Sequence, residues 1–180
     1  VVRKIDAGAV VTTIAGTATT SGFNDAVGTA AIFNAPTGLA LINSGADLVV
    51  ADSGNNILRH VVISTKTVTT YAGSPSQDSG FTDGVPPNAR FNTPHGIAAD
   101  ASDVAYVTDS GNHAVRKILA DQSVVTLAGT GASGLVNNAI GVVSEFSSPA
   151  GIEVISGGYL LVADTANSAV RMIAPNGFVT

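Results

Sequence analysis

The sequence predicts an all-β protein built from the blades of a β-propeller. Three observations favour this class: the chain repeats about every 56 residues, each repeat holds four short runs of strand-forming residues, and no segment has the periodicity of an amphipathic helix. Four short antiparallel strands in a repeat of this length are typical of a propeller blade, whereas a solenoid repeat usually carries one or two elements. We therefore expect sheets arranged around an axis rather than a solenoid.

The repeat is defined by positions that recur in register along the chain. A triplet of one apolar residue, Ala and Gly occurs three times. The triplets end at Gly16, Gly73 and Gly129, at spacings of 57 and 56 residues. Arg3 stands 56 residues before Arg59, which indicates that a partial repeat precedes the first full one. The other recurring positions are spaced by 55 to 58 residues: Phe33, Phe91 and Phe146; Pro36, Pro94 and Pro149; Gly38, Gly96 and Gly151; Asp52, Asp109 and Asp164; Asn55, Asn112 and Asn167; Arg59, Arg116 and Arg171.

Within a repeat, short apolar and β-branched runs alternate with polar turn residues. The runs of the first full repeat span residues 38–42, 47–51, 56–62 and 67–71. The intervening segments are short and carry the residue types that turns favour. This pattern predicts a four-stranded antiparallel sheet in each repeat. At most a single helical turn is expected before each repeated Phe, around residues 28–32, 87–90 and 142–145.

Composition supports a packed core and excludes several classes of function. Of the 180 residues, 45% are hydrophobic, which is too apolar for a disordered chain. Only eight residues are Lys or Arg and the net charge is −5, so we expect no nucleic-acid partner. The absence of Cys excludes disulfides, thiol catalysis and Cys-based zinc sites. No apolar run is long enough for a membrane-spanning helix.

The middle repeat carries a motif that resembles a known family. Phe91-Asn92-Thr93-Pro94-His95-Gly96-Ile97-Ala98, followed by Val107-Thr108-Asp109-Ser110-Gly111-Asn112-His113-Ala114-Val115-Arg116, is similar to the NHL repeat. The third repeat departs from the pattern at Ser147 and at Thr165-Ala166. The resemblance implies a propeller of about six blades. Proteins with NHL-type propellers include protein-binding platforms, RNA readers, extracellular modules and a few metal-dependent enzymes, so the function has to be argued from the site.

The repeat boundaries predict that residues 1–180 form a partial NHL propeller. Residues 1–16 are expected to end a preceding blade, and residues 37–73, 95–129 and 150–180 to form three blades, the last incomplete. The chain has no signal-peptide pattern, and we expect a mature, processed or excised piece. Three blades would expose an apolar flank at each end of an arc. Two explanations remain open: a homodimer closes one six-bladed ring, each chain being half of it, or the chain is part of a longer one.

The repeated polar positions are expected to be structural. Asp-Ser-Gly-Asn is typical of a hairpin turn in which Asp and Asn side chains accept bonds from nearby amides and Gly takes a positive φ. An Arg follows each Asp by seven residues, on the next strand, and we expect an Asp–Arg ion pair in each blade. These structural positions are Asp52, Asp109, Asp164, Asn55, Asn112, Asn167, Arg59, Arg116 and Arg171.

His95 departs from its sister repeats, which have Thr37 and Ala150 at this position. The position precedes the innermost strand, so the side chain should face the central channel or its rim. A His here resembles a zinc-ligand position of the amidating lyases built on NHL-type propellers, which need several such residues. This chain offers one per copy. The expected role is therefore a polar cap of the channel, and we predict no metal site, cofactor or catalytic residue.

The three long loops, residues 17–35, 74–93 and 130–148, are the strongest candidates for binding, because loops of this length are unusual and often functional. They are expected to emerge on one face. Candidate binding residues on these loops are Arg90, Asp83, Asp25 and Glu145, with His95 at the channel, although Arg90 and Glu145 could instead form salt bridges between blades. Phe23, Phe81 and Leu135 are expected to be buried plugs beneath this face.

These observations favour a non-catalytic scaffold that recognises a protein or another macromolecule through its long-loop face. Low charge makes shape and apolar contact the expected basis of recognition. The alternative is a metal-dependent hydrolase or lyase that uses the central channel around His95. An extracellular or cell-surface location is expected, since the resemblance implies it and the chain is poor in Lys and rich in Thr, Ser and Gly.

Overall fold

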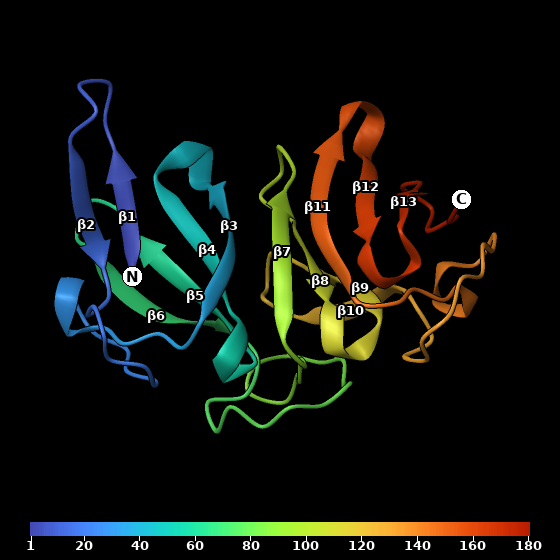
Figure 1. Cartoon of the computed structure of the whole chain (residues 1–180), viewed down its shortest axis with the longest axis horizontal. Coiled ribbons are helices and arrows are strands. Elements are labelled where there is room, and N and C mark those ends of the chain that lie inside the picture. Colours follow the sequence, from blue (N-terminus) through green and yellow to red (C-terminus); the bar gives the residue numbers. More distant parts are fainter.

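The computed structural model describes residues 1–180 as thirteen strands in four antiparallel sheets. The sheets stand side by side along an arc whose two ends hold the N- and C-termini (Figure 1). The predicted all-β propeller architecture is confirmed. None of the helical turns has the length and apolar character needed to cross a membrane.

Each sheet corresponds to one repeat. The first is the hairpin of β1 (Val2–Ile5) and β2 (Val11–Ala15). The second, in spatial order, consists of β3 (Pro36–Ile42), β4 (Asp47–Asp52), β5 (Ile57–Val62) and β6 (Thr67–Ala72). The third consists of β7 (Pro94–Ala99), β8 (Ala105–Asp109), β9 (Ala114–Ile118) and β10 (Val124–Ala128). The fourth consists of β11 (Pro149–Ile155), β12 (Tyr159–Asp164) and β13 (Ala169–Ile173).

We call the last three sheets the first, second and third blades, and β1–β2 the N-terminal hairpin. The first strand of each blade is the innermost, and β7 lies between β3 and β11. Beyond β13, Val179 forms an isolated bridge with Ile173, and the backbone of Met172 exchanges two hydrogen bonds with Thr180. A fourth strand of the third blade therefore begins at the end of the chain.

The Asp-Ser-Gly-Asn segments differ from the predicted turn. Each is a single turn of 3-10 helix, Ser53–Asn55 in the first blade, and the left-handed residue is the one that follows it, Asn56 at φ 55°. Gly54 instead makes room for a neighbour, because a Cβ there would lie 2.5 Å from the Cγ of Asn34. The equivalent turns are Ser110–Asn112, followed by His113, and Thr165–Asn167, followed by Ser168.

Two of the three helical turns predicted before the repeated Phe are present, at Gly28–Ala30 and Gly141–Val143. The segment 87–90 forms an irregular turn instead. It begins with the second of two consecutive prolines, Pro86 and Pro87, whose nitrogens have no hydrogen to donate to a helical turn. The other short turns are Asn43–Gly45, which links β3 to β4, and Ser156–Gly158, which links β11 to β12.

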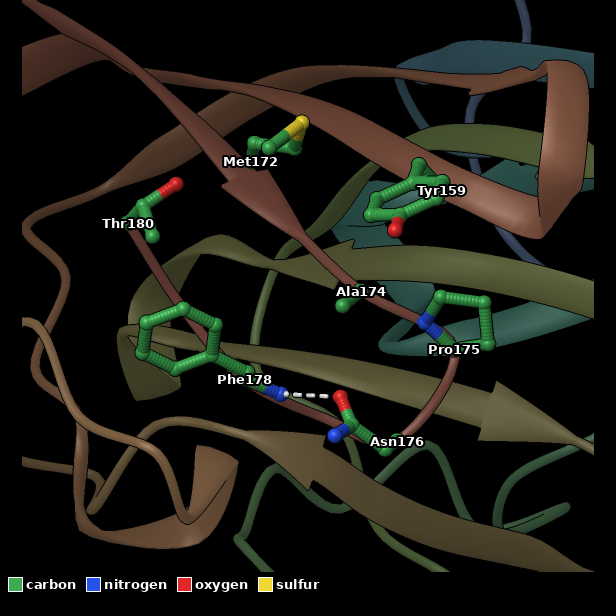
Figure 2. Close-up of a pocket in the computed structure, with 7 residues that line it drawn as sticks. All are labelled: Tyr159, Met172, Ala174, Pro175, Asn176, Phe178 and Thr180. Carbon is green, nitrogen blue, oxygen red and sulfur yellow. Dashed lines mark hydrogen bonds between the residues drawn. The ribbon is translucent and has the colours of Figure 1, made fainter.

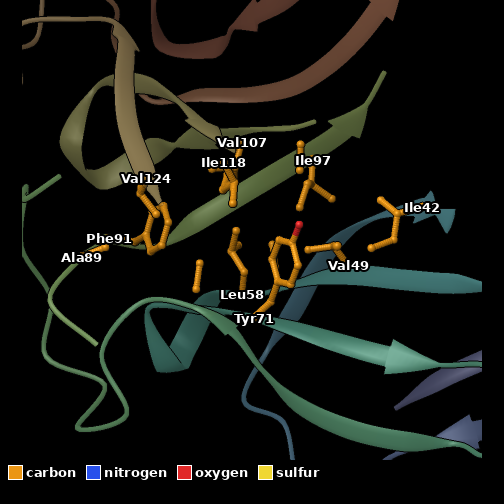
Figure 3. Packing of buried hydrophobic residues seen from close by; sticks show 13 residues of the cluster. Ile42, Val49, Leu58, Tyr71, Ala89, Phe91, Ile97, Val107, Ile118 and Val124 are labelled. Atoms are coloured by element: carbon orange, nitrogen blue, oxygen red, sulfur yellow. The ribbon is translucent and has the colours of Figure 1, made fainter. Parts of the chain in front are cut away.

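The hydrophobic core lies between adjacent blades rather than within one. Between the first and second blades, Val49 and Leu58 from one side meet Phe91 and Val107 from the other, all without solvent exposure (Figure 3). Similar clusters lie between the N-terminal hairpin and the first blade, and between the second and third blades. Because blades bury their apolar faces against each other, each blade depends on its neighbours for stability.

The long loops protect the outer edge of each four-stranded sheet and of the last strand in the third blade. They leave and re-enter the sheets at one edge of the arc, but their middle residues run along the outermost strand. Val68 of β6 donates its N–H to the carbonyl of Ala26 at 2.9 Å, and Gly28 donates to Lys66 at 2.8 Å. Gly84 and Val124 exchange the same kind of bond in the second blade. The loops therefore cover strand edges that would otherwise be open to pairing with other chains.

Candidate binding face

Each blade holds a buried arginine at the base of its long loop, and we call this residue with its polar and aromatic partners the arginine hub. In the first blade, Arg59 donates from one terminal nitrogen to Asp52 Oδ2 at 2.8 Å, with both side chains fully buried. Asn55 donates to the same oxygen at 2.9 Å, and the N–H of Asn34 donates to Oδ1 at 2.7 Å. The buried carboxylate is thus fully hydrogen-bonded, as burial of a charge requires.

The other terminal nitrogen of Arg59 holds the long loop. It donates to Asp25 Oδ1 at 2.7 Å and to the carbonyl of Asn24 at 2.9 Å. Asp25 Oδ2 in turn accepts from the N–H of Thr70 on β6 at 3.0 Å. One guanidinium therefore joins the blade, its long loop and, through Asp25, the outermost strand.

Aromatic rings cover the guanidinium of Arg59 on both faces. The Phe23 and Phe33 ring centres lie 4.8 and 4.9 Å from its central carbon. Such stacking favours a cation that has been removed from water.

The hub of the second blade repeats this arrangement. Arg116 pairs with buried Asp109 at 2.7 Å and with Asp83 of the long loop at 2.6 Å. Its guanidinium lies between Phe81 and Phe91, at 5.0 and 5.4 Å from the ring centres. Partial burial tends to raise the pKa of Asp83, but hydrogen bonds from Thr126 and Arg116 outweigh it and hold that pKa below its usual value.

The hub of the third blade departs from the pattern at two positions. Arg171 keeps its buried partner Asp164 at 2.9 Å and its inner ring Phe146 at 4.9 Å. Asn137 replaces the second carboxylate and accepts from Arg171 Nε at 3.1 Å. Leu135 replaces the outer ring. The third hub therefore carries one negative charge fewer than its sisters and leaves one face of the guanidinium without an aromatic cover.

The structure places the candidate binding residues of the loops in different environments. Asp25 and Asp83 are partly exposed but engaged by the hubs. Arg90 is half-buried and donates to three backbone carbonyls of its own loop, those of residues 87, 88 and 89, at 2.7 to 3.1 Å. Glu145 is half-buried against Gly134, where a Cβ would lie 2.0 Å from its Oε2. Neither Arg90 nor Glu145 forms the salt bridge between blades considered as an alternative.

The expectation that Phe23, Phe81 and Leu135 are buried plugs is wrong. Phe81 is 40% exposed and Leu135 59% exposed, while Phe23 is partly buried. The inner Phe of each repeat fills the core, so the outer side chain lies over the guanidinium with one side toward solvent.

His95 is exposed on the innermost strand β7, and its carbonyl accepts from Thr37 Oγ1 of the first blade at 2.8 Å. No group of three or more His, Asp or Glu side chains is arranged to hold a metal ion. His60 faces Asp47 at 3.0 Å. His113 accepts from the N–H of Ser148 at 3.0 Å through Nδ1 and so links the second blade to the third.

Exposed apolar side chains gather on the third long loop, a feature that the sequence analysis missed. The first loop exposes Val27 and the second Phe81 and Val85. The third loop exposes five large apolar residues, Leu135, Val136, Ile140, Val142 and Val143. An alignment of the three loops could have shown this difference, because the third loop has Leu135 and Asn137 where the other two loops have Phe and Asp.

Comparison with known proteins agrees with this architecture. Residues 91–118 match the model of the NHL repeat. Over 152 residues, 78% of this chain, the sequence is 34% identical to NHL repeat-containing protein 2 of Bos taurus, covering 21% of that protein. The chain spans less than a quarter of the length of the curated relatives it matches.

Solved structures share the fold at low sequence identity. A protein of unknown function from Bacteroides thetaiotaomicron superposes with a TM-score of 0.75 at 19% identity, over 92% of this chain and 40% of that one. A gluconolactonase from Xanthomonas campestris superposes with a TM-score of 0.58 at 16% identity, over 81% of this chain and 46% of that one. At these identities the likeness concerns the fold alone.

Proposed function

Because the chain belongs to the NHL-repeat family of β-propeller proteins, we propose that it is a non-catalytic binding module that recognises a protein surface through its third long loop. The observation that carries this proposal is the group of exposed apolar side chains on residues 130–148. Features shared by all blades serve the fold, whereas this group occurs in one loop only. Exposed apolar side chains that form one patch mark interaction surfaces in soluble proteins.

The chemistry of the loop favours apolar recognition. Ile140 is 60% exposed and Leu135 of the same loop 59% exposed, and the third hub, which binds this loop through Val136, carries less charge than its sisters. A partner with a complementary apolar surface would bury these side chains without having to desolvate a carboxylate. The net charge of −5 argues against a strongly acidic partner.

A peptide-display selection against the immobilised chain tests the proposal. We expect selected peptides to be rich in apolar and aromatic residues and to shift backbone NMR signals of residues 130–148. Ile140→Asp should weaken binding about tenfold or more, which corresponds to about 1.4 kcal/mol. Val125→Asp, at an exposed valine of β10, is the matched control and should leave binding unchanged. Peptides that map elsewhere, or that bind Ile140→Asp normally, would contradict the proposal.

The enzymatic alternative rests on His95, which is exposed on the innermost strand. A hydrolase or lyase with a metal in the channel needs several ligands, and the structure brings no group of three His, Asp or Glu side chains together around His95. Stoichiometric zinc retained by the purified protein and lost in His95→Ala would favour this alternative over the binding module. An extracellular or cell-surface location stays a prediction.

A further inference from the structure

The second and third blades form a pocket between them, at the edge of the arc opposite to the long loops. It lies where the β7–β8 turn of the second blade meets the β11–β12 turn of the third (Figure 1). Asp100, Tyr106 and Lys117 supply its polar wall, and Leu127 and Leu160 supply apolar surface. Its volume of about 210 Å³ corresponds to about seven waters at about 30 Å³ each, or to one small organic molecule.

The junction between the first and second blades shows what fills this position one blade earlier. There Asp103, in the β7–β8 turn, reaches back to the first blade and accepts from the N–H of Asn43 at 2.8 Å. Burial, and then the charge of Asp103, raise the pKa of Tyr71, so the carboxylate lies close to that side chain as well. His60 faces Asp47 Oδ2 at 3.0 Å, and its ring centre lies 6.0 Å from that of Tyr71. The first junction is therefore filled by its own side chains.

The second junction carries the equivalents of these side chains around the pocket. In repeat register, they are Asp100 for Asn43, Lys117 for His60 and Leu127 for Tyr71. The equivalent of Asp103 is Gly158, since both stand six residues before the buried Asp of their blade. Their backbones are alike, with φ of 60° and 75°, but Gly158 has no side chain. The pocket is therefore the space that the Asp103 side chain fills one blade earlier.

Lys117 is a cation without a counter-ion at this pocket. It is half-buried, its Nζ lies 5.8 Å from the centre of the Tyr106 ring, and it forms no ion pair. Its counterpart His60 faces Asp47, but Val104 stands at the position of Asp47 in the second blade. A half-buried ammonium group without a carboxylate partner favours an anionic group that arrives with a ligand.

Asp100 supplies the opposite charge on the same wall. Its Oδ1 accepts from the N–H groups of Ser102 and Val104 at 2.8 and 3.1 Å, and its Oδ2 accepts from the Tyr106 hydroxyl at 3.1 Å. Burial and the charge of Asp100 raise the pKa of Tyr106 to about 12, so the hydroxyl remains a donor at neutral pH. A carboxylate has about four acceptor sites, so Asp100 can accept one more hydrogen bond from a ligand.

The third blade closes the pocket with a well-bonded turn after β13. Ala174 and Pro175 of this turn line the pocket, and their other side lines the neighbouring pocket drawn in Figure 2. Ala174 donates its N–H to the carbonyl of Phe178 at 2.8 Å, and Asn176 accepts from the N–H of Phe178 at 3.1 Å. Because this wall is held by its own hydrogen bonds, a ligand does not have to order it.

We propose that this pocket binds a small α-amino acid with an aliphatic side chain, which occupies the space that Asp103 fills one blade earlier. The carboxylate of the ligand pairs with Lys117. Its ammonium group donates to Asp100, and its aliphatic side chain packs against Leu127 and Leu160. A zwitterion is the chosen ligand because the wall offers one cation and one anion that do not pair with each other. This site is separate from the third long loop and independent of the function proposed for that loop.

Titration of the isotope-labelled chain with L-leucine tests the proposal. We expect backbone NMR signals of residues 100–106, 157–158 and 174 to shift with a dissociation constant of about 1 mM or below, while signals of the third long loop stay unchanged. Lys117→Gln should weaken binding at least about tenfold. Lys66→Gln, at an exposed lysine of the first blade, is the matched control. No shifts at these residues, or normal binding by Lys117→Gln, would overturn the proposal.

Analogues of leucine test the two charges separately. Isoamylamine is leucine without its carboxylate, and isocaproate is leucine without its ammonium group. Each should bind at least about tenfold more weakly than leucine, because each leaves one charge of the pocket without a partner. Isoamylamine that binds as tightly as leucine would overturn the role of Lys117, and isocaproate that does so would overturn the role of Asp100.

Gly158→Asp tests where the ligand lies. The variant gives the second junction the side chain that Asp103 supplies to the first. A Cβ on Gly158 would lie 3.5 Å from the nearest atom, the Cγ of Pro175, so the folded chain has room for the change. Leucine binding should weaken at least about tenfold, whereas Ser156→Asp, in the same turn but outside the pocket, should bind normally. Normal binding by Gly158→Asp would overturn the assignment of the ligand to this space.

Discussion

The second and third blades share a strand order and a buried Asp–Arg pair, but they differ in the neighbours of the flank, in the innermost glycine, Gly96 or Gly151, and in the hub. The second blade is enclosed on both sides, its glycine contacts the next carbonyl, and its hub has two carboxylates. The third blade has an open flank, a glycine without a contact and one carboxylate. The difference teaches that a repeat position can keep its residue type while the surroundings of that position change.

The largest expected effect concerns the number of carboxylates in a hub. Asp164→Asn leaves buried Arg171 without any carboxylate and should cost about 3–5 kcal/mol of unfolding free energy. Asp109→Asn should cost clearly less, because Asp83 still pairs with Arg116. Urea denaturation of both variants at one protein concentration measures the difference. Equal losses of unfolding free energy in the two variants would show that Asp83 does not compensate for the missing charge of Asp109.

Glycine substitutions test the enclosed and open flanks directly. Gly96→Ala places a methyl group against the Ala150 carbonyl and should cost about 1–3 kcal/mol. Gly151→Ala meets no close atom and should change stability by less than about 0.5 kcal/mol. Both variants are compared by urea denaturation at one protein concentration. A large loss in Gly151→Ala would show that the position is already constrained within one chain.

Exchange of the outer hub residue tests the aromatic cover. Phe81→Leu gives the second hub the residue of the third and should cost about 0.5–1.5 kcal/mol, since one face of Arg116 loses its ring. Leu135→Phe is the reciprocal change and should stabilise the third blade by a similar or smaller amount. Thermal unfolding checks both variants, and a destabilising Leu135→Phe would mean that the third loop cannot adopt the sister geometry.

The smallest expected effect is the pH dependence contributed by Asp83. Because its pKa is lowered in the folded chain, its contribution to stability is complete above the unfolded pKa of about 3.9 and is lost as pH falls through the folded value. Asp83→Asn should therefore cost about 1 kcal/mol or less at pH 7, since the side chain is 48% exposed, and almost nothing near pH 2. Stability curves of both proteins from pH 2 to pH 7 check this. A loss of stability that does not change with pH would show that Asp83 contributes through packing rather than through its charge.

Much of the blade can be predicted from local pattern. The spacing of seven residues between Asp52 and Arg59 crosses one tight turn, so it brings the two side chains together on paired strands. The positions of the long loops can also be predicted from the sequence, but the path of each loop along the neighbouring strand cannot. Ala26 and Gly84 pair with the outermost strands, a contact that depends on where the sheet edge lies in space.

Phe23 and Phe81 illustrate a second limit. Their apolar character predicts burial, yet each covers an arginine and keeps one side in solvent. The position of each ring is explained by the buried Arg beneath it. That Arg lies 36 residues after Phe23 in the first blade and 35 residues after Phe81 in the second. A pattern within a short window of sequence cannot predict a contact between residues so far apart.

The repeat, the four strands of each blade and the polar pairs within a blade follow from the order of residues, because they depend on neighbours a few positions apart. The exposure of Val170 and the space beside Gly151 emerged only from the folded chain. The physical reason is that a blade has no interior of its own. Its faces become core or surface according to whether another blade lies against them, and no single repeat specifies that.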